Sequence, residues 1–468
     1  MDPQIPPYAP ASPDILASSA IEPLLTREFD ADPAPVYERL REKYGQVAPV
    51  LLLGVPVWLV LGYDEVLAVL RNQRGLWSKR TADWRACVQG RIPADWPLLP
   101  VYESTGMPFH EGRSHAELRE AWAAGLRPFQ SRAQPQARRL EDEIHGHADE
   151  LLDLLAEGGP SGFADLSAQY ARPLAVMACN RLIGFDATTD EALIDIWRVV
   201  DAGPDANAAM ARLAGGIGRL VAARGDRPGD DLPSGMLAAR PELTAERIAT
   251  EMVNVLSTLG DMGSSLICNT IVEVVAGDAG ARASLATGMI GETVNRAAMA
   301  SPPNTNLTLR FARADTTLGG TVIAAGDPVM ASVAAAHADP RFAGALDPHS
   351  VNSSRAHLAW GAGPHRCPAD ELATRIVSIA VERLFERMAE LELGLPVDQL
   401  PWRSSPLMRG LRSLPVRYRL HEHPASTARP AAPEAAERPA PDEPGEDARG
   451  GRHSPLARLV RALLRQGS

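Results

Sequence analysis

The spacing of apolar residues divides the chain into a short sheet near its start and a long helical body. From Gln46 to Leu61, two apolar runs are separated by Gly54 and Pro56, a pattern typical of two short strands joined by a turn. Helical spacing is expected at residues 32–43, 64–72, 112–125, 137–157 and 186–202. The protein is therefore predicted to be mainly α, with a small β-rich part.

The longest predicted helix begins after Thr244, a good N-cap residue, and runs to Gly277, which ends it. At 1.5 Å per residue, about 30 residues span roughly 45 Å, the width of a whole domain. Gly260 and Gly263 lie midway, where each costs roughly 1 kcal/mol relative to Ala. We expect a kink there, or the close approach of a ligand.

A second β-rich segment runs from Thr316 to Ala331, with Gly319 and Gly320 in a predicted hairpin turn. A long irregular stretch follows, from His337 to Gly363. Long loops within a compact domain usually carry function, so we expect functional residues at or near its end.

The composition predicts four regions along the chain. An N-terminal arm covers residues 1–24, and the folded domain covers 25–422. Residues 423–453 are rich in Pro, Ala and acidic residues and are predicted to be a disordered linker. Residues 454–468 form a basic amphipathic helix that could dock on an anionic membrane or in a partner's groove, or stay largely unfolded.

Charge and cysteine content exclude some classes of function. The net charge of −11 argues against a nucleic-acid partner. The four cysteines, Cys87, Cys179, Cys268 and Cys367, lack the spacing of a zinc site or a disulfide scaffold, which suits a reducing cytoplasm. No signal peptide or run of about 18 apolar residues is apparent, so a soluble protein is expected.

The segment with the clearest chemistry is Trp-Gly-Ala-Gly-Pro-His-Arg-Cys-Pro-Ala, residues 360–369. Its two glycines allow the backbone to approach a flat ligand closely. Cys367 lies where the next helix is expected to begin, and the helix dipole there should favour its thiolate form. The pattern indicates a metal site with a thiolate ligand, although a buried, inert cysteine would also fit it.

This segment resembles the cysteine-ligand loop of the cytochrome P-450 family. Trp360, Gly363 and His365 stand where that family has an aromatic, a glycine and a basic residue before the cysteine, although Trp replaces the usual Phe. Ala369 replaces a usual Gly. The resemblance implies a P-450 fold, in which haem b lies between the long helix and this loop, with Cys367 as the iron ligand.

The resemblance continues over residues 30–420, and it implies the groups that hold the haem propionates. His115 and Arg119 match the family's C-helix motif, and their spacing of four places them on one helix face. Arg310, just before the hairpin, matches a second propionate-binding arginine. With His365, these residues would provide four basic groups for two acids.

The sequence departs from the family on the long distal helix. Met262 and Gly263 align with the acid and the alcohol that usually deliver protons to bound dioxygen. Asp261 and Ser264 are each one residue away, about 100° around an α-helix. Their side chains therefore point elsewhere, and neither is expected to replace the missing acid or alcohol. Met262, Gly263 and Ser264 are thus the helix positions expected to face the iron.

A second departure concerns the Glu-x-x-Arg motif of the next helix. Thr293 and Arg296 stand at its two positions, and Glu292 could pair with Arg296 one turn away. The family's loop arginine aligns near Ser350, with Arg355 close by. This sequence is similar in that respect to the few actinobacterial members that lack the motif.

Three functions are compatible with these residues. The first is a monooxygenase that acts on a small apolar molecule with electrons from a separate ferredoxin and reductase. The second is a haem-binding partner or regulatory protein without monooxygenase activity of its own. The third is a peroxide-driven peroxygenase. Residues 80–110 should lie over the pocket, where Trp84, Trp96 and Tyr102 could shape it or simply pack.

Overall fold

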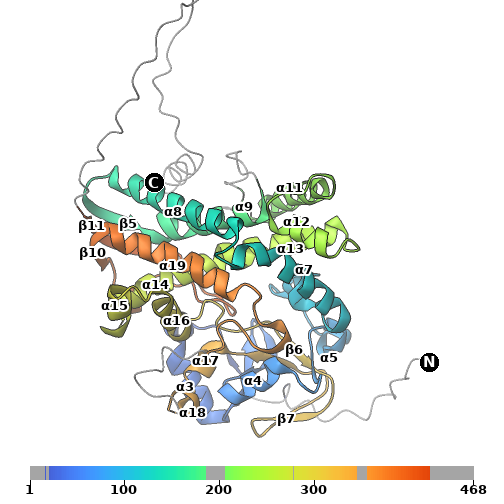
Figure 1. The fold of residues 1–468 in the computed structure, drawn as a ribbon. Coiled ribbons are helices and arrows are strands. Elements are labelled where there is room, and N and C mark those ends of the chain that lie inside the picture. Colours follow the sequence, from blue (N-terminus) through green and yellow to red (C-terminus); the bar gives the residue numbers. More distant parts are fainter. Residues whose placement is uncertain are drawn as a thin grey trace, which may run out of the picture.

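The computed structural model describes residues 21–185, 206–277, 279–344 and 356–421, together with Leu16 and Asp195. A large helical part lies against a smaller part that contains most of the strands (Figure 1). The mainly α fold with a small β-rich part is thus confirmed.

The helical part is built around one large apolar core. The long helix runs through this core, and α8 packs against both α7 and α19. The helices of this part are α7 (Gly112–Gln130), α8 (Pro135–Ala156), α9 (Arg172–Ile183), α11 (Ala206–Asp226), α12 (Leu232–Ala239), α13 (Ala245–Val255), α14 (Ser264–Ala276), α15 (Ala279–Ala286), α16 (Ile290–Ala300) and α19 (Asp370–Arg387), with the π-helical segments η3 (Ser167–Ala171) and η4 (Leu256–Gly263).

The smaller part is organised by a six-stranded sheet of order β1-β2-β3-β9-β6-β4. The predicted pair at 46–61 is its antiparallel hairpin, in which Val47 pairs with Val60. The strands are β1 (Glu22–Pro23), β2 (Val47–Leu52), β3 (Val55–Val60), β4 (Trp77–Ser78), β6 (Arg310–Ala312) and β9 (Pro328–Ala331). The helices around it are α2 (Arg27–Ala31), α3 (Pro33–Tyr44), α4 (Tyr63–Arg71), α5 (Arg85–Val88), α6 (Leu99–Tyr102), α17 (Val333–His337) and α18 (Pro340–Ala343).

Two further sheets complete the described structure. β7 (Thr316–Leu318) and β8 (Thr321–Ile323) form the predicted hairpin, with Gly319 and Gly320 both at positive φ. The other sheet has the order β10-β11-β5, from β10 (Met388–Leu393), β11 (Pro415–Leu420) and β5 (Ser161–Asp165). Short 3-10 turns are η1 (Thr81–Asp83), η2 (Met107–Phe109), η6 (Gly363–His365) and η7 (Val397–Gln399).

The long helix begins and ends where the sequence predicts. Thr244 Oγ1 accepts a hydrogen bond from the Arg247 amide at 3.2 Å, and the helix ends at Gly277. Its middle, however, is π-helical over Leu256–Gly263. The 100° spacing assumed between Asp261 and Met262 is therefore too large, because an i→i+5 helix turns less per residue, whereas Ser264 begins the α-helix α14.

Three predicted segments lie wholly or mostly outside the described residues. These are the N-terminal arm apart from Leu16 and residues 21–24, most of the helix expected at 186–202, and all of the tail beyond residue 421. Within the described part, Ala245–Ala276 is long and apolar enough to cross a membrane, but 56% of its apolar window is buried inside the protein. It is the core helix of the helical part.

Candidate cofactor site

The cysteine loop is a tight turn held by backbone hydrogen bonds. The Cys367 amide donates to the Trp360 carbonyl at 2.8 Å, and the Arg366 amide donates to the Gly363 carbonyl at 3.1 Å. Gly363 has φ +66°, and a Cβ atom there would lie 2.6 Å from the Leu70 carbonyl oxygen at the end of α4. Only glycine fits this contact, which fixes the loop against the smaller part.

The free thiol of Cys367 is not activated in the way the sequence suggests. Burial raises its pKa to about 11, while the Ala369 amide, which donates to Sγ at 3.4 Å, lowers it. Helix α19 begins only at Asp370, whose carboxylate raises the pKa of the thiol further. For the free thiol, burial thus outweighs the effect expected from the helix dipole, and a bound metal cation would favour loss of the proton.

Three of the predicted basic residues converge beside this loop. The His115 ring on α7 lies 4.2 Å, between centroids, from the His365 ring in the cysteine loop. Arg310 on β6 is buried and donates to the Val69 carbonyl at 3.2 Å. The Coulomb interactions among His115, Arg310 and His365 place them in one electrostatic cluster.

A fourth member of this basic cluster, Lys79, was missed by the sequence analysis. It directly follows β4, is only 7% exposed, and donates from Nζ to Thr308 Oγ1 at 3.0 Å. Its neighbour Arg80 is also basic and is exposed, so the local pattern does not distinguish the buried cation from a surface one. The only sequence signal is a lysine directly after a short apolar strand.

The electrostatics of the cluster indicate a site for an anionic group. Burial lowers the pKa of His365 to about 2, and Lys79, Arg310, His115 and Arg119 lower it further. Burial, and then the charge of Arg310, lowers the pKa of Lys79 well below its ordinary value. Because these cations depress one another's protonation, a bound anion would relieve them all.

Two buried ring nitrogens are also left without a partner. His115 Nε2 and His365 Nδ1 have no hydrogen-bond partner among the described residues. Buried polar atoms are nearly always hydrogen-bonded, so these nitrogens point to a missing ligand. Carboxylate groups beside the cysteine loop would satisfy them, and this donor set fits a haem whose propionates lie in the cluster.

Arg119 lies at the edge of the cluster, next to Cys367. Its Nη1 donates to the Arg366 carbonyl, one residue before Cys367. Its charge lowers the pKa of the Cys367 thiol. Arg119 therefore supports the cysteine loop directly, in addition to contributing positive charge.

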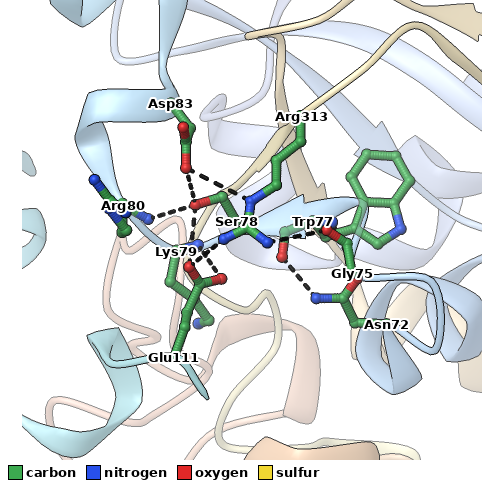
Figure 2. A network of polar contacts seen from close by, with 9 residues as sticks. All are labelled: Asn72, Gly75, Trp77, Ser78, Lys79, Arg80, Asp83, Glu111 and Arg313. Carbon is green, nitrogen blue, oxygen red and sulfur yellow. Dashed lines mark hydrogen bonds and ion pairs between the residues drawn. The ribbon is translucent and has the colours of Figure 1, made fainter. Parts of the chain in front are cut away.

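A polar network on the outer side fixes the backbone of Lys79 (Figure 2). Glu111 Oε1 accepts from the Lys79 amide at 3.0 Å, and Arg313 Nη2 donates to Glu111 Oε2 at 2.7 Å. Ser78 Oγ donates to Asp83 at 2.5 Å. A surface depression of about 490 Å³ opens beside this network, lined by Arg80, Phe109, His110, Glu111, Gly112 and Arg313. Glu111 is thus held at the rim by Arg313.

On the long helix, the acid nearest the predicted iron-facing positions is already paired. Asp261 forms an ion pair with Arg403 at 2.6 Å. Ser264 is buried, and its Oγ donates to the Asp261 carbonyl at 2.9 Å. Met262 is half-buried and Gly263 is buried. The hydroxyl and the carboxylate of this segment therefore both have partners within the protein.

The Glu-x-x-Arg region leaves polar side-chain atoms without hydrogen-bond partners in the described chain. Thr293 is buried, and its Oγ1 is one of them. Oε1 of Glu292 is another. Ser350 and Arg355 lie outside the described residues.

The aromatic residues of segment 80–110 pack together in the interior. Trp84 stacks on Phe311 with ring centroids 5.1 Å apart, and Trp96 stacks on Tyr102 at 5.9 Å. The Tyr102 hydroxyl accepts from the Leu309 amide at 2.9 Å. We call Trp84, Trp96, Tyr102 and Phe311 the aromatic cluster; it ties segment 80–110 to β6.

Comparison with known proteins identifies a single family over most of the chain. No family model matched the sequence. The chain is 32% identical to the cytochrome P-450 monooxygenase PikC of Streptomyces venezuelae over 426 residues, which cover 87% of this chain and 95% of PikC. It is 28% identical to the 6-deoxyerythronolide B hydroxylase of Saccharopolyspora erythraea over 424 residues, 85% of this chain and 99% of that enzyme.

Solved structures agree with the sequence relatives. CYP154A1 from Streptomyces coelicolor superposes with a TM-score of 0.70 at 28% identity, over 85% of this chain and 99% of that one. CYP154C4 from a Streptomyces species superposes with a TM-score of 0.73 at 27% identity, over 85% and 97%.

Proposed function

Because the chain belongs to the cytochrome P-450 family, we propose that it is a haem-thiolate monooxygenase that oxidises a small apolar organic molecule. One observation carries this proposal. Three buried basic side chains (Lys79, His115 and Arg310) converge on the half-buried His365 of the cysteine loop, and two ring nitrogens of this cluster lack partners among the described residues. Such a cluster suits the two carboxylates of haem b.

Each residue of the site would have a distinct task. Cys367 would ligate the iron, and the four basic groups of the cluster, assisted by Arg119, would bind the propionates. Gly363 and Trp360 shape the turn that presents the sulfur. A thiolate-ligated haem supplies the chemistry that cleaves the O–O bond of dioxygen.

Protons on the distal side would have to come from water or from the substrate. Asp261 is engaged by Arg403, and Met262 and Gly263 carry no titratable group. This observation favours a second candidate, a peroxide-driven peroxygenase, because peroxide is already reduced and needs no staged proton delivery. Turnover with hydrogen peroxide and no reductase would distinguish it from the monooxygenase.

The names of the relatives leave the substrate of this chain open. The relatives include PikC, a 2-hydroxy-5-methyl-1-naphthoate 7-hydroxylase and a vitamin D(3) 25-hydroxylase, which are named for chemically different molecules. The proposal therefore stops at a small apolar substrate, with electrons from a separate ferredoxin and reductase. We place the protein in the cytoplasm and assign it no nucleic-acid partner.

The first test is the carbon monoxide difference spectrum of the reduced protein. The wild type should give the red-shifted band of a thiolate-ligated haem, and Cys367→Ala should lose it. Cys87→Ala is the matched control, since Cys87 is a partly exposed free cysteine on α5. The proposal fails if the wild type binds no haem, or if the band survives in Cys367→Ala.

A further inference from the structure

His337 is a buried imidazole that joins two elements next to the cysteine loop. It is the last residue of α17 and is 8% exposed. On one side lies the end of α16, and on the other lies the segment that leads into the loop at Leu358. The function proposed above uses no residue of this bridge.

The two hydrogen bonds of the imidazole fix its protonation. Nδ1 lies 3.0 Å from the Met299 carbonyl oxygen, and the Leu358 amide donates to Nε2 at 2.8 Å. A carbonyl can only accept and an amide N–H can only donate, so Nδ1 carries the proton and Nε2 does not. The ring must be neutral to make both bonds. Burial, with a smaller effect of His357, lowers its pKa to about 3.

The backbone groups that His337 joins depend on it for hydrogen bonds. The Met299 carbonyl is in the last turn of α16, where no intrahelical amide reaches it. The Leu358 carbonyl accepts from the Gly361 amide at 2.8 Å, and the Trp360 carbonyl then accepts from the Cys367 amide. A continuous series of hydrogen bonds thus leads from α16 through His337 to the cysteine.

We propose that His337 is a positioning residue that ties α16 to the cysteine loop and so holds Cys367 in place for the haem iron. The Glu-x-x-Arg motif, which would otherwise fix this side of the haem site, is absent from α16. The inference rests on the haem-thiolate site proposed above. It accounts for how the loop can be held although Thr293 replaces the acid and its hydroxyl has no partner in the described chain.

The test compares three variants of the full-length holoprotein. His337→Leu removes both hydrogen bonds, whereas His337→Asn keeps an N–H donor for the Met299 carbonyl. His147→Leu, on α8, controls for the loss of a largely buried imidazole elsewhere. The readout is the ratio of the thiolate-type carbon monoxide band to the shorter-wavelength band of a displaced ligand, beside haem content and thermal unfolding.

The ratio should fall roughly tenfold in His337→Leu, because two buried backbone groups lose their partner. His337→Asn should fall between His337→Leu and the wild type, since its amide N–H can donate to the Met299 carbonyl from the place of Nδ1 but no atom of Asn reaches the place of Nε2. His147→Leu should leave the ratio unchanged. A His337→Leu protein with the wild-type ratio would overturn the proposal.

A measurement on the wild type covers the case in which His337→Leu does not fold. In histidine-labelled protein as its ferrous carbon monoxide complex, nitrogen NMR should show Nδ1 protonated and Nε2 unprotonated. A protonated Nε2, or titration near the ordinary histidine pKa, would refute the bridge. If the wild type instead lacked the thiolate band, the proposed function would fail, while the same NMR measurement on the protein as isolated would still test the bridge.

Discussion

At the scale of single residues, the site depends on burying several positive charges close together. Lys79 and Arg310 are both more than nine-tenths buried, and the pKa of Arg310 falls to about 10, mainly through burial. Cations in such an arrangement oppose folding until an anion joins them. The basic cluster is therefore expected to reduce the stability of the empty protein and to favour the loaded one.

Replacing Lys79 with methionine should separate these two effects. Haem binding should weaken roughly tenfold, because a charge-assisted hydrogen bond to a propionate is lost. The haem-free protein should become more stable by about 1 kcal/mol, because an uncompensated buried charge is removed. Haem titration and urea unfolding of the haem-free protein measure the two quantities.

Lys43→Met is the control for this pair of measurements. Lys43 is half-exposed and pairs with Glu22 at the surface. Neither quantity should change appreciably. If Lys79→Met bound haem as tightly as the wild type, Lys79 would have to be removed from the propionate set.

At the scale of elements, the cysteine loop and α4 fit together through one glycine. Gly361 and Gly363 both have positive φ, but only at Gly363 would a Cβ atom clash with backbone, 2.6 Å from the Leu70 carbonyl oxygen. At Gly361 the nearest atom would be 3.6 Å away. The two positions therefore separate conformational strain from a steric clash.

Gly361→Ala should lower the free energy of unfolding by about 1 kcal/mol, the cost of a left-handed conformation. Gly363→Ala should cost about 3 kcal/mol or more, because the clash adds to that strain. It should also reduce the thiolate-type band, since the loop must move away from α4. Denaturant unfolding of both variants measures the difference; equal costs would show that the loop adjusts freely.

The elements show which parts of the fold the sequence can predict. The cap at Thr244 and the stop at Gly277 are local signals, and both were correct. The π-helical segment was missed, because apolar spacing does not reveal a change in backbone hydrogen bonding. Lys79 and the Asp261–Arg403 pair were missed for a related reason, since residues far apart in sequence create both environments.

At the scale of the whole molecule, the buried neutral His337 makes the stability of the fold depend on pH. His337 has a pKa of about 3 in the folded protein, whereas an unfolded histidine titrates near its ordinary value. Below the ordinary histidine pKa of about 6.5, the unfolded state binds a proton that the folded state does not. The free energy of unfolding is therefore highest above about pH 6.5 and falls as the pH decreases towards 3.

Between pH 7 and pH 5, this one group should reduce the free energy of unfolding by about 2 kcal/mol. His337→Asn should lose that part of the pH dependence, because an amide side chain does not titrate in this range. Urea unfolding of wild type and variant at both pH values is the measurement. If the free energy of unfolding decreased equally in the two proteins, the pKa of His337 would have to be the same in the folded and unfolded states.

Strand β6 connects the aromatic cluster to the basic cluster. Neighbouring residues of a strand point to opposite faces, so β6 presents Phe311 to the aromatic cluster and Arg310 to the basic side chains. A substitution that repacks Trp84 would therefore also shift Arg310. If the basic cluster binds a cofactor as proposed, protein engineering within the aromatic cluster would weaken the binding of that cofactor as well.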